Sequence, residues 1–248
     1  MARIIDFKIG DVDTTALVSL PSGSGPFPGV VVAFHREGID RFTEWVCDDL
    51  ARNGYAAITP NHYHVLPPGV GSDRRREFLT DEQMAADLKA AADWLVSDAN
   101  VDRKRIGILG HCMGGRTTLL GLAALPDVFA CGCDWYGGNA FGQLGKVPPP
   151  ADRLAAVKAP LMGFFGNDDK SPSPDDVRTL DRILTELGKW HEFHQYDGTG
   201  HAFMGASREK HREHASRDSW GRALTFLNRH LGGKAPARVE IFPAAELV

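Results

Sequence analysis

One short segment carries the clearest chemical signal in the chain. Residues 105–115 read RIGILGHCMGG, an apolar run followed by a cysteine between two spaced glycines, and a helical stretch follows over 117–125. A strand that turns sharply into a helix lifts the residue at the turn above the sheet, and the glycines leave room where strand and helix cross. By itself the motif also fits a buried cysteine in a loop, so other residues must decide whether Cys112 is a nucleophile.

An acid and a base follow the cysteine in an informative order. The apolar run 160–166 reads as a buried strand and ends at Asp168 and Asp169, so a carboxylate lies at the carboxyl end of a strand, where parallel sheets carry functional groups. A further strand over 190–196 leads through a glycine-rich loop to His201, just before the last predicted helix. Nucleophile, acid and histidine in this order are typical of the α/β-hydrolases.

These side-chain types suit acyl transfer. A free thiol titrates near about pH 8.5 and a histidine near about 6.5, so an adjacent imidazole takes the thiol proton near neutrality and leaves a nucleophilic thiolate. A carboxylate on the other imidazole nitrogen fixes the tautomer of His201. The Met113 backbone N–H, at the start of the helix, is placed to donate to a developing oxyanion. Water activated by His201 would then release the acyl group.

The rest of the chain predicts the framework that positions these residues. Residues 3–9 and 14–20 indicate a leading antiparallel pair, and strands then alternate with helices. The expected later strands include 29–34, 55–59, 160–166 and 190–196, and the expected helices include 41–53 and about 207–231. The alternation predicts an α/β-hydrolase fold, a mostly parallel central sheet with helices on both faces. We expect a single domain over 1–231 and a C-terminal tail over 232–248.

Two helices between these strands have well-marked starts. Thr80 to Gln83 reads as a capping box, and Ser173 followed by Pro174 is a second helix start. Each helix then shows one apolar stripe that should face the core, formed by Met84, Leu88, Ala91 and Leu95 in the first and by Val177, Leu180, Leu184 and Leu187 in the second.

Composition excludes several classes of protein. With 248 residues, 43% of them hydrophobic, and a net charge of −4, the chain can bury one full core and offers no electrostatic case for nucleic acid. Neither a secretory leader nor a membrane-spanning apolar stretch is apparent, so we expect a cytoplasmic protein without a membrane partner. The spacing of Cys47, Cys131 and Cys133 suggests neither zinc nor disulfides, and these three are expected to be buried.

Four motifs together resemble the dienelactone hydrolase family. They are Gly110-His111-Cys112-Met113-Gly114-Gly115, Asp134-Trp135-Tyr136-Gly137-Gly138, Phe165-Gly166-Asn167-Asp168-Asp169 and Gly200-His201-Ala202-Phe203. The resemblance extends from about Gly29 to Leu231. It implies a Cys-His-Asp triad at Cys112, His201 and Asp169, with the second oxyanion donor being the backbone of Arg36. It also implies hydrolysis of a lactone such as carboxymethylenebutenolide, with no metal and no organic cofactor.

The chain departs from that family at two positions. The family usually has a glutamate directly after the strand over 29–34, where it keeps the resting thiol neutral, whereas this chain has His35-Arg36-Glu37. Either Glu37 reaches back, or His35 replaces the acid, or the gating is absent. The family example also carries an arginine shortly after the catalytic histidine to hold the substrate carboxylate, and here Arg208 comes only later. That absence favours neutral esters or lactones, unless Arg208 or a residue of the run Arg74-Arg75-Arg76 supplies the charge.

Several hypotheses about the site and the function stay open at this stage. The candidates for gating or substrate binding are His35, Glu37, Tyr63, Trp135, Tyr136 and Phe203. Histidines 62 and 64 together with His35 invite a metal interpretation, which we disfavour because no carboxylate or cysteine completes the set. The expected partner is a small ester or lactone, and the protein is expected to be a monomer or homodimer. The alternatives to a lactonase are a broad carboxylesterase, a thioesterase, or a non-catalytic relative whose cysteine senses redox state.

Overall fold

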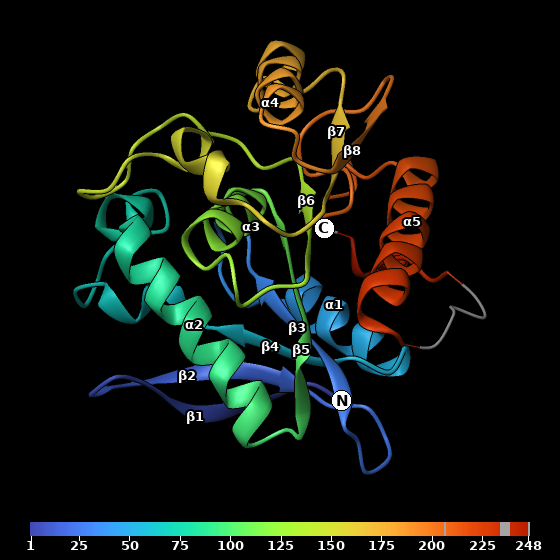
Figure 1. Cartoon of the computed structure of the whole chain (residues 1–248). Helices are drawn as coiled ribbons and strands as arrows, with labels where there is room; N and C mark the ends of the chain where they lie inside the picture. The colour runs from blue at the N-terminus through green and yellow to red at the C-terminus, as the bar shows by residue number, and fades with distance from the viewer. Residues whose placement is uncertain (206, 234–238, 248) are drawn as a thin grey trace.

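An eight-stranded mixed sheet crosses the described part of the molecule (Figure 1). The computed structural model describes residues 1–205, 207–233 and 239–247. In spatial order the strands are β1 (Arg3–Ile9), β2 (Val12–Ser19), β4 (Ala56–Pro60), β3 (Phe27–Ala33), β5 (Val101–His111), β6 (Cys131–Trp135), β7 (Leu161–Gly166) and β8 (His191–Tyr196). The β2 strand runs antiparallel to both β1 and β4, and every later pairing is parallel. The predicted α/β-hydrolase fold is confirmed.

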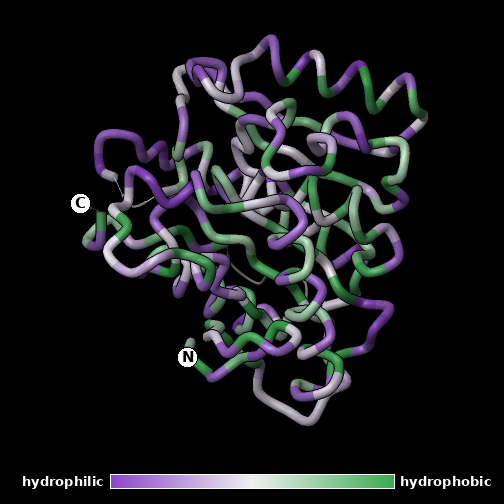
Figure 2. The backbone as a smooth tube through the Cα atoms, turned by 90° about the vertical axis from the view of Figure 1, so that its left-hand side faces the viewer, coloured by the Kyte–Doolittle hydropathy of each residue, from purple (hydrophilic) through white to green (hydrophobic). Residues whose placement is uncertain are grey.

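Helices cover both faces of this sheet (Figure 1). One core cluster joins the sheet to α1 (Arg41–Arg52) and α5 (Glu213–Leu231), and a second joins it to α2 (Asp81–Ser97), α3 (Met113–Ala124) and α4 (Pro174–Glu186). Short 3-10 helices lie in the connections, namely η1 (His62–Val65), η2 (Arg75–Phe78), η3 (Pro150–Ala156) and η4 (Ala244–Glu246). The two-sided cover explains why β3 and β5 to β7 read as apolar runs rather than as alternating patterns. Apolar segments cross the middle of the molecule and polar ones lie mostly at its periphery (Figure 2).

Three details of the helices differ from the sequence prediction. The last helix begins at Glu213 and not near Ser207, because the chain before it forms turns tied back by the Arg212 backbone N–H to the Phe203 carbonyl. Thr80 caps α2 through the Gln83 N–H, but the Gln83 side chain turns to the His62 carbonyl instead of closing a capping box. Leu187 follows the end of α4 and is exposed, so only the first three residues of that stripe face the core.

The segment 239–247 packs against the body of the protein. Phe242 is buried with its ring 5.5 Å from that of Phe42 on α1, and Arg41 pairs with Glu246 at 3.0 Å. The parts of the expected tail at 234–238 and 248 lie outside the described residues. The division into a domain and a tail therefore stays a prediction, although 239–247 contributes to the core that α1 and α5 share.

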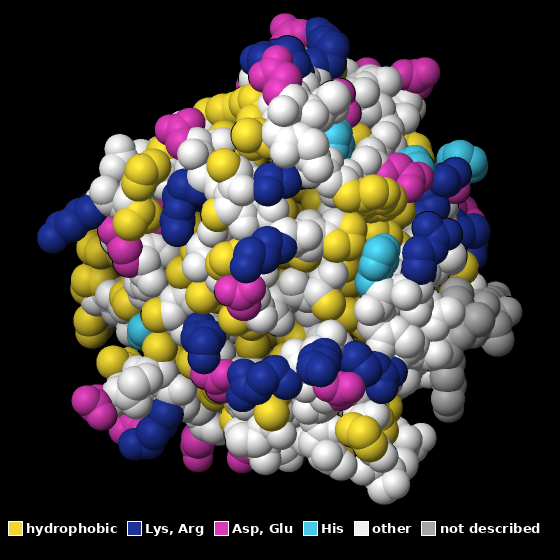
Figure 3. All heavy atoms as spheres, viewed as in Figure 1, with side chains coloured by type: hydrophobic (Ala, Val, Ile, Leu, Met, Phe, Trp, Pro, Cys, Tyr) yellow, Lys and Arg dark blue, Asp and Glu magenta, His cyan; other side chains and the backbone are white. Residues whose placement is uncertain are grey.

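The hydrophobicity of the helices and the distribution of surface charge are relevant to contact with a membrane or a charged partner. No helix in the described ranges combines the length and the apolar character needed to cross a membrane. On the face shown in Figure 3, cationic and anionic side chains are interspersed, and the outer end of the molecule formed by α4 carries both signs.

Candidate active site

Cys112 occupies a tight turn between β5 and α3. Its backbone adopts φ 58° and ψ −117°, an unusual conformation for a residue with a side chain, and it precedes the first residue of α3. A Cβ at Gly110 would overlap the Gly114 backbone, and a Cβ at Gly114 would overlap the Ala33 carbonyl on the neighbouring strand. The steric requirement for glycine that the sequence predicts at both positions is therefore explained by specific neighbouring atoms. The turn presents the thiol at the carboxyl edge of the sheet.

The structure brings Cys112, His201 and Asp169 together from three separate segments. His201 Nε2 lies 3.0 Å from the Cys112 sulfur, and His201 Nδ1 lies 2.8 Å from Asp169 Oδ2. Asp169 is buried and also accepts a hydrogen bond from the Ser171 N–H at 2.9 Å, so its carboxylate is held in place. Asp168 is exposed, and among the described residues its side chain makes no contact with His201. Of the two adjacent carboxylates, only Asp169 is placed to orient the imidazole.

The surroundings of this triad favour a charged pair. Burial alone would raise the pKa of the Cys112 thiol, but the hydrogen bond and charge of His201, with the Met113 and Arg36 N–H groups, hold it below its ordinary value. Burial would likewise lower the pKa of His201, yet Asp169 and the Cys112 sulfur raise that pKa to about 10. Both shifts favour a thiolate beside an imidazolium at neutral pH.

The two predicted oxyanion donors converge on the sulfur. The backbone N–H groups of Met113 and Arg36 both lower the pKa of the Cys112 thiol, one from the start of α3 and one from the loop after β3. That loop is held from outside the sheet, because the Tyr63 hydroxyl donates to the Arg36 carbonyl at 2.5 Å and Arg75 donates to the Glu37 carbonyl at 3.0 Å. Tyr63 thus binds the carbonyl of the residue whose own N–H acts on the Cys112 thiol.

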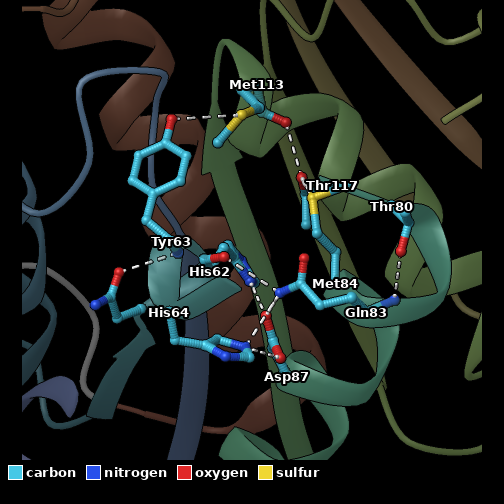
Figure 4. Close-up of polar contacts among 10 residues, drawn as sticks. His62, Tyr63, His64, Thr80, Gln83, Met84, Asp87, Met113 and Thr117 are labelled. Atoms are coloured by element: carbon cyan, nitrogen blue, oxygen red, sulfur yellow. Dashed lines mark hydrogen bonds and ion pairs between the residues drawn. The ribbon is translucent and has the colours of Figure 1, made fainter. Parts of the chain in front are cut away.

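A buried polar cluster anchors the turn that carries Tyr63. The imidazoles of His62 and His64 lie 2.8 Å and 3.0 Å from the two carboxylate oxygens of Asp87 on α2, and Gln83 contacts the same carboxylate (Figure 4). The Tyr63 ring points away from this cluster toward Met113 (Figure 4), with its hydroxyl 4.0 Å from the Met113 sulfur. Within the described ranges, no group of three or more possible ligands could hold a metal ion. The cluster therefore serves to fix η1 and, through it, Tyr63.

Replacing Tyr63 by phenylalanine tests this arrangement. Loss of one hydrogen bond to the Arg36 carbonyl should remove about 1 kcal/mol of stabilisation, so we expect kcat to fall about fivefold while KM changes little. The measurement is steady-state hydrolysis of an activated ester. An unchanged kcat would show that the Arg36 loop holds its position without Tyr63.

A cavity of about 610 Å³ opens beside the triad. Of the residues proposed from sequence for gating or binding, His35, Glu37 and Tyr136 line it, as do Arg36 and Met113. Tyr136 is almost fully buried, with its ring packed edge-on against His201 at 5.1 Å between centroids. Burial raises the pKa of the Tyr136 phenol, so this residue supports the His201 ring as a neutral side chain.

The predicted positions of Trp135 and Phe203 in the pocket wall are wrong. Trp135 points into the sheet core, where its ring stacks between His111 at 4.7 Å and Phe164 at 4.7 Å. Phe203 is fully buried behind Tyr136, whose ring is 5.0 Å away. Each of these two residues is a direct neighbour in sequence of a residue that lines the pocket. The side chain of Trp135 points inward because side chains alternate along β6, and that of Phe203 points inward because of the turn after His201.

Glu37 does not reach back to the thiol. Its carboxylate is exposed and accepts hydrogen bonds from the Arg36 guanidinium at 3.2 and 3.3 Å. His35 occupies the inner position instead, with its ring on the pocket wall. Of the alternatives left open by the sequence, the one in which Glu37 gates the thiol has no support in this geometry.

The sequence analysis missed an ion pair that holds the elbow helix. Arg116 on α3 is 1% exposed and contacts both carboxylate oxygens of buried Asp81, at 2.6 and 3.1 Å. The same guanidinium donates to the carbonyls of Asn139 and Gly142, so it joins α2, α3 and the loop after β6. An arginine in the otherwise apolar and small-residue sequence of α3 was the available signal. A buried guanidinium requires such partners.

The sequence profile of the dienelactone hydrolase family matches residues 14–231. The chain belongs to this family. A Methylorubrum extorquens relative named "Putative carboxymethylenebutenolidase" is 30% identical over 221 residues, which make up 86% of this chain and 75% of the relative. Membership shows a hydrolase that acts on esters or lactones.

Three further similarities extend almost end to end. A Bradyrhizobium protein named "Probable 2-oxo-3-(5-oxofuran-2-ylidene)propanoate lactonase" is 30% identical over 93% of this chain and 95% of its own length. Among solved structures of the dienelactone hydrolase family, that of a Klebsiella pneumoniae protein superposes with a TM-score of 0.84 at 28% identity, covering 92% of this chain and 99% of the other. An esterase from Thermogutta terrifontis, at 18% identity and a TM-score of 0.75, shares the fold.

Proposed function

We propose that this protein is a cysteine-dependent hydrolase of small anionic lactones and esters, working through Cys112, His201 and Asp169. The observation that carries the proposal is the continuous chain of contacts from the Asp169 carboxylate through both nitrogens of His201 to the Cys112 sulfur. Family membership supports the class of reaction. The pocket that opens on the same sulfur supports a substrate of small size.

Acylation follows from the positions of these groups. The Cys112 thiolate attacks the carbonyl carbon of the substrate, and the oxyanion that forms accepts hydrogen bonds from the Met113 and Arg36 N–H groups. As the ring C–O bond of a lactone breaks, the imidazolium of His201 gives its proton to the leaving oxygen. The product stays attached as a thioester, and His201 is left neutral with its Nδ1–H on Asp169.

Deacylation reverses the roles. Neutral His201 takes a proton from a water molecule, and the resulting hydroxide adds to the thioester carbonyl, again within the pair of N–H donors. The C–S bond then breaks, because a thiolate is a good leaving group, and the free acid departs. His201 ends protonated beside the Cys112 thiolate, as at the start, so one water is consumed for each ester bond.

Charges on the pocket wall favour an anionic substrate. Arg76 from η2, Lys170 after β7 and Lys210 before α5 line the cavity, and none of the three has an ion-pair partner among the described residues. The three acids of the same wall are engaged, Asp169 by His201, Glu37 by Arg36 and Asp40 by His35. The sequence favoured neutral substrates because no arginine closely follows His201, but the folded chain supplies cations from other segments.

Arg76 is the best placed of these cations. Burial and the nearby guanidinium of Arg116 lower its pKa from the usual arginine value, whereas the Cys112 sulfur acts in the opposite sense, which places Arg76 within electrostatic reach of the nucleophile. A carboxylate in the substrate could therefore be held while the carbonyl lies at Cys112. The Bradyrhizobium relative is named for a lactone that carries a carboxylate, which agrees with this choice.

A substrate panel on wild type and Arg76→Gln tests the proposal. We expect a carboxylate-bearing dienelactone to be hydrolysed with a higher kcat/KM than neutral aryl esters and acyl thioesters of similar size. Arg76→Gln should lower kcat/KM for the anionic lactone by about tenfold or more, because a hydrogen bond to a charged group contributes roughly 1.5–3 kcal/mol. The neutral esters should change little. The matched control is Arg74→Gln, since Arg74 lies on the same loop but is exposed and paired with Glu77.

Three outcomes would contradict this account of the substrate. Equal losses for anionic and neutral substrates would show that Arg76 is structural. A preference for neutral aryl esters in wild type would make the protein a broad carboxylesterase, and a preference for acyl thioesters would make it a thioesterase.

A further inference from the structure

A second histidine–carboxylate pair lies on the wall of the catalytic pocket. His35 follows β3, lines the cavity with Cys112, and places its Nε2 3.0 Å from Asp40 Oδ2. Asp40 is itself held, because its other oxygen accepts from the N–H of Thr43 at 2.9 Å and from the Thr43 hydroxyl at 3.0 Å as the N-cap of α1. The His35 side chain is 21% exposed and packs its edge on Phe42. For its Nδ1, no hydrogen bond is found among the described residues.

The ring has several charged neighbours. Burial would lower the pKa of His35, but the hydrogen bond and charge of Asp40, together with the Cys112 sulfur and Glu37, raise it. Burial would raise the pKa of Asp40, whereas His35 and the Thr43 groups lower it. The contact at 3.0 Å and both shifts favour the charged forms, an imidazolium on His35 and a carboxylate on Asp40.

The neighbouring histidine does not share this charge. His111, next to Cys112, is 3% exposed, and its ring stacks on Trp135. Burial, with a smaller contribution from the His35 charge, lowers the pKa of His111 to about 3. Burial thus favours the neutral form of His111, and His35 is the histidine on that side of the pocket whose carboxylate partner favours the charged form.

Further charged groups surround the sulfur, and Lys170 and Lys210 lie on the same cavity wall. His201 lies on one side with the imidazole nitrogen at 3.0 Å, and Arg76 contributes a positive charge from η2. The phenols of Tyr63 and Tyr136 also face it, and burial raises the pKa of both, so they stay neutral. Among these groups, His35 is a cation whose charge depends on one identified partner, Asp40.

We propose that His35, held by Asp40, is a positioning residue that keeps the Cys112 thiolate formed in the free enzyme, before any substrate binds. The inference rests on the proposed role of Cys112 as nucleophile and adds how its ionisation is maintained. With an imidazolium on each side, the proton stays on His201 and the negative charge stays on sulfur. The nucleophile is then permanently active and needs no substrate-driven gating by a nearby acid.

The rate of Cys112 alkylation by iodoacetamide, measured from pH 4 to 10 without substrate, tests this directly. Only the thiolate reacts, so the midpoint of the profile reports the ionisation of Cys112. Replacing His35 by glutamine removes an opposite charge near the thiolate, and such charges lower a pKa by about one unit or more. We therefore expect the midpoint in His35→Gln to move up by about one pH unit, with the plateau rate at high pH unchanged.

Two further variants make the result specific. Asp40→Asn keeps an N-cap side chain for α1 but removes the charge that holds His35 protonated, so its profile should shift in the same direction. His191→Gln is the matched control, because His191 pairs with Asp181 at the same distance of 3.0 Å on the far edge strand β8. Its profile should coincide with that of wild type.

Identical midpoints for wild type, His35→Gln and Asp40→Asn would overturn the inference. So would a lower plateau without a shift, because that is the sign of a purely structural role. The proposed function fails under a different result, namely hydrolysis that persists after Cys112 has been fully alkylated. The two failures are distinguishable, because the alkylation profile needs no turnover.

Discussion

Cys112→Ala should lower kcat/KM for ester hydrolysis by about 10⁴-fold or more, with the fold intact. The substitution removes the atom that forms the acyl-enzyme, and single nucleophile deletions in catalytic triads have effects of at least this size. The residual rate should be that of direct attack by water on a substrate that is still bound in the pocket and still contacts the oxyanion donors. Steady-state hydrolysis of the preferred substrate and a thermal unfolding curve are the two measurements.

The matched control for this prediction is Cys47→Ala. Cys47 is fully buried on α1, where burial raises the pKa of its thiol to about 12, so it is not a nucleophile at neutral pH. Cys47→Ala should lose some stability to the small cavity but retain its activity. Loss of activity in Cys47→Ala, with retention in Cys112→Ala, would contradict the assignment of the nucleophile.

Asp169→Asn should reduce kcat by about 10⁴-fold, whereas Asp168→Asn should change it by less than about threefold. An amide at position 169 presents an N–H to His201 Nδ1 and so favours the imidazole tautomer that cannot accept the thiol proton. Asp168 lies next in sequence but is exposed and does not touch His201. Each variant is therefore the natural control for the other, with the same change of charge one residue apart.

The relative loss of kcat in these two variants decides which aspartate orients His201. A large effect of Asp168→Asn together with a mild effect of Asp169→Asn would overturn the choice of Asp169. Similar losses in both would indicate that the loop after β7 has been distorted, and a circular dichroism spectrum in the aromatic region would detect that distortion.

The elements that position the triad could be predicted from the sequence, because each is determined by residues that lie close together in the chain. Close backbone contacts exclude a side chain at Gly110 and Gly114. These two glycines therefore stand at a fixed spacing on either side of Cys112, which is visible in the sequence. The strand over 160–166 is a buried apolar run followed by polar residues, and the strand before His201 is a mostly polar, partly exposed edge strand. The carboxylate choice between Asp168 and Asp169 came from the resemblance, since spacing alone leaves both possible.

The direction of side chains beyond those elements was harder to predict. Trp135 and Tyr136 are neighbours, yet one is in the core and the other at the site, because Tyr136 adopts a positive φ of 43° just after β6. Arg76 comes from η2, a short segment without a periodic pattern, and enters the pocket only through tertiary packing. The Arg116–Asp81 pair joins two helices that sequence cannot place side by side.

The most direct test of the account is to trap the acyl-enzyme. A chromogenic ester mixed with excess enzyme and quenched in acid within milliseconds should leave the acyl group on the peptide that contains Cys112, as seen by mass spectrometry. The amount should rise and decay at the rates of product formation, and His201→Gln, which lacks the base, should not turn over. An acyl group on any other residue, or full turnover with no covalent species in wild type, would contradict the cysteine mechanism.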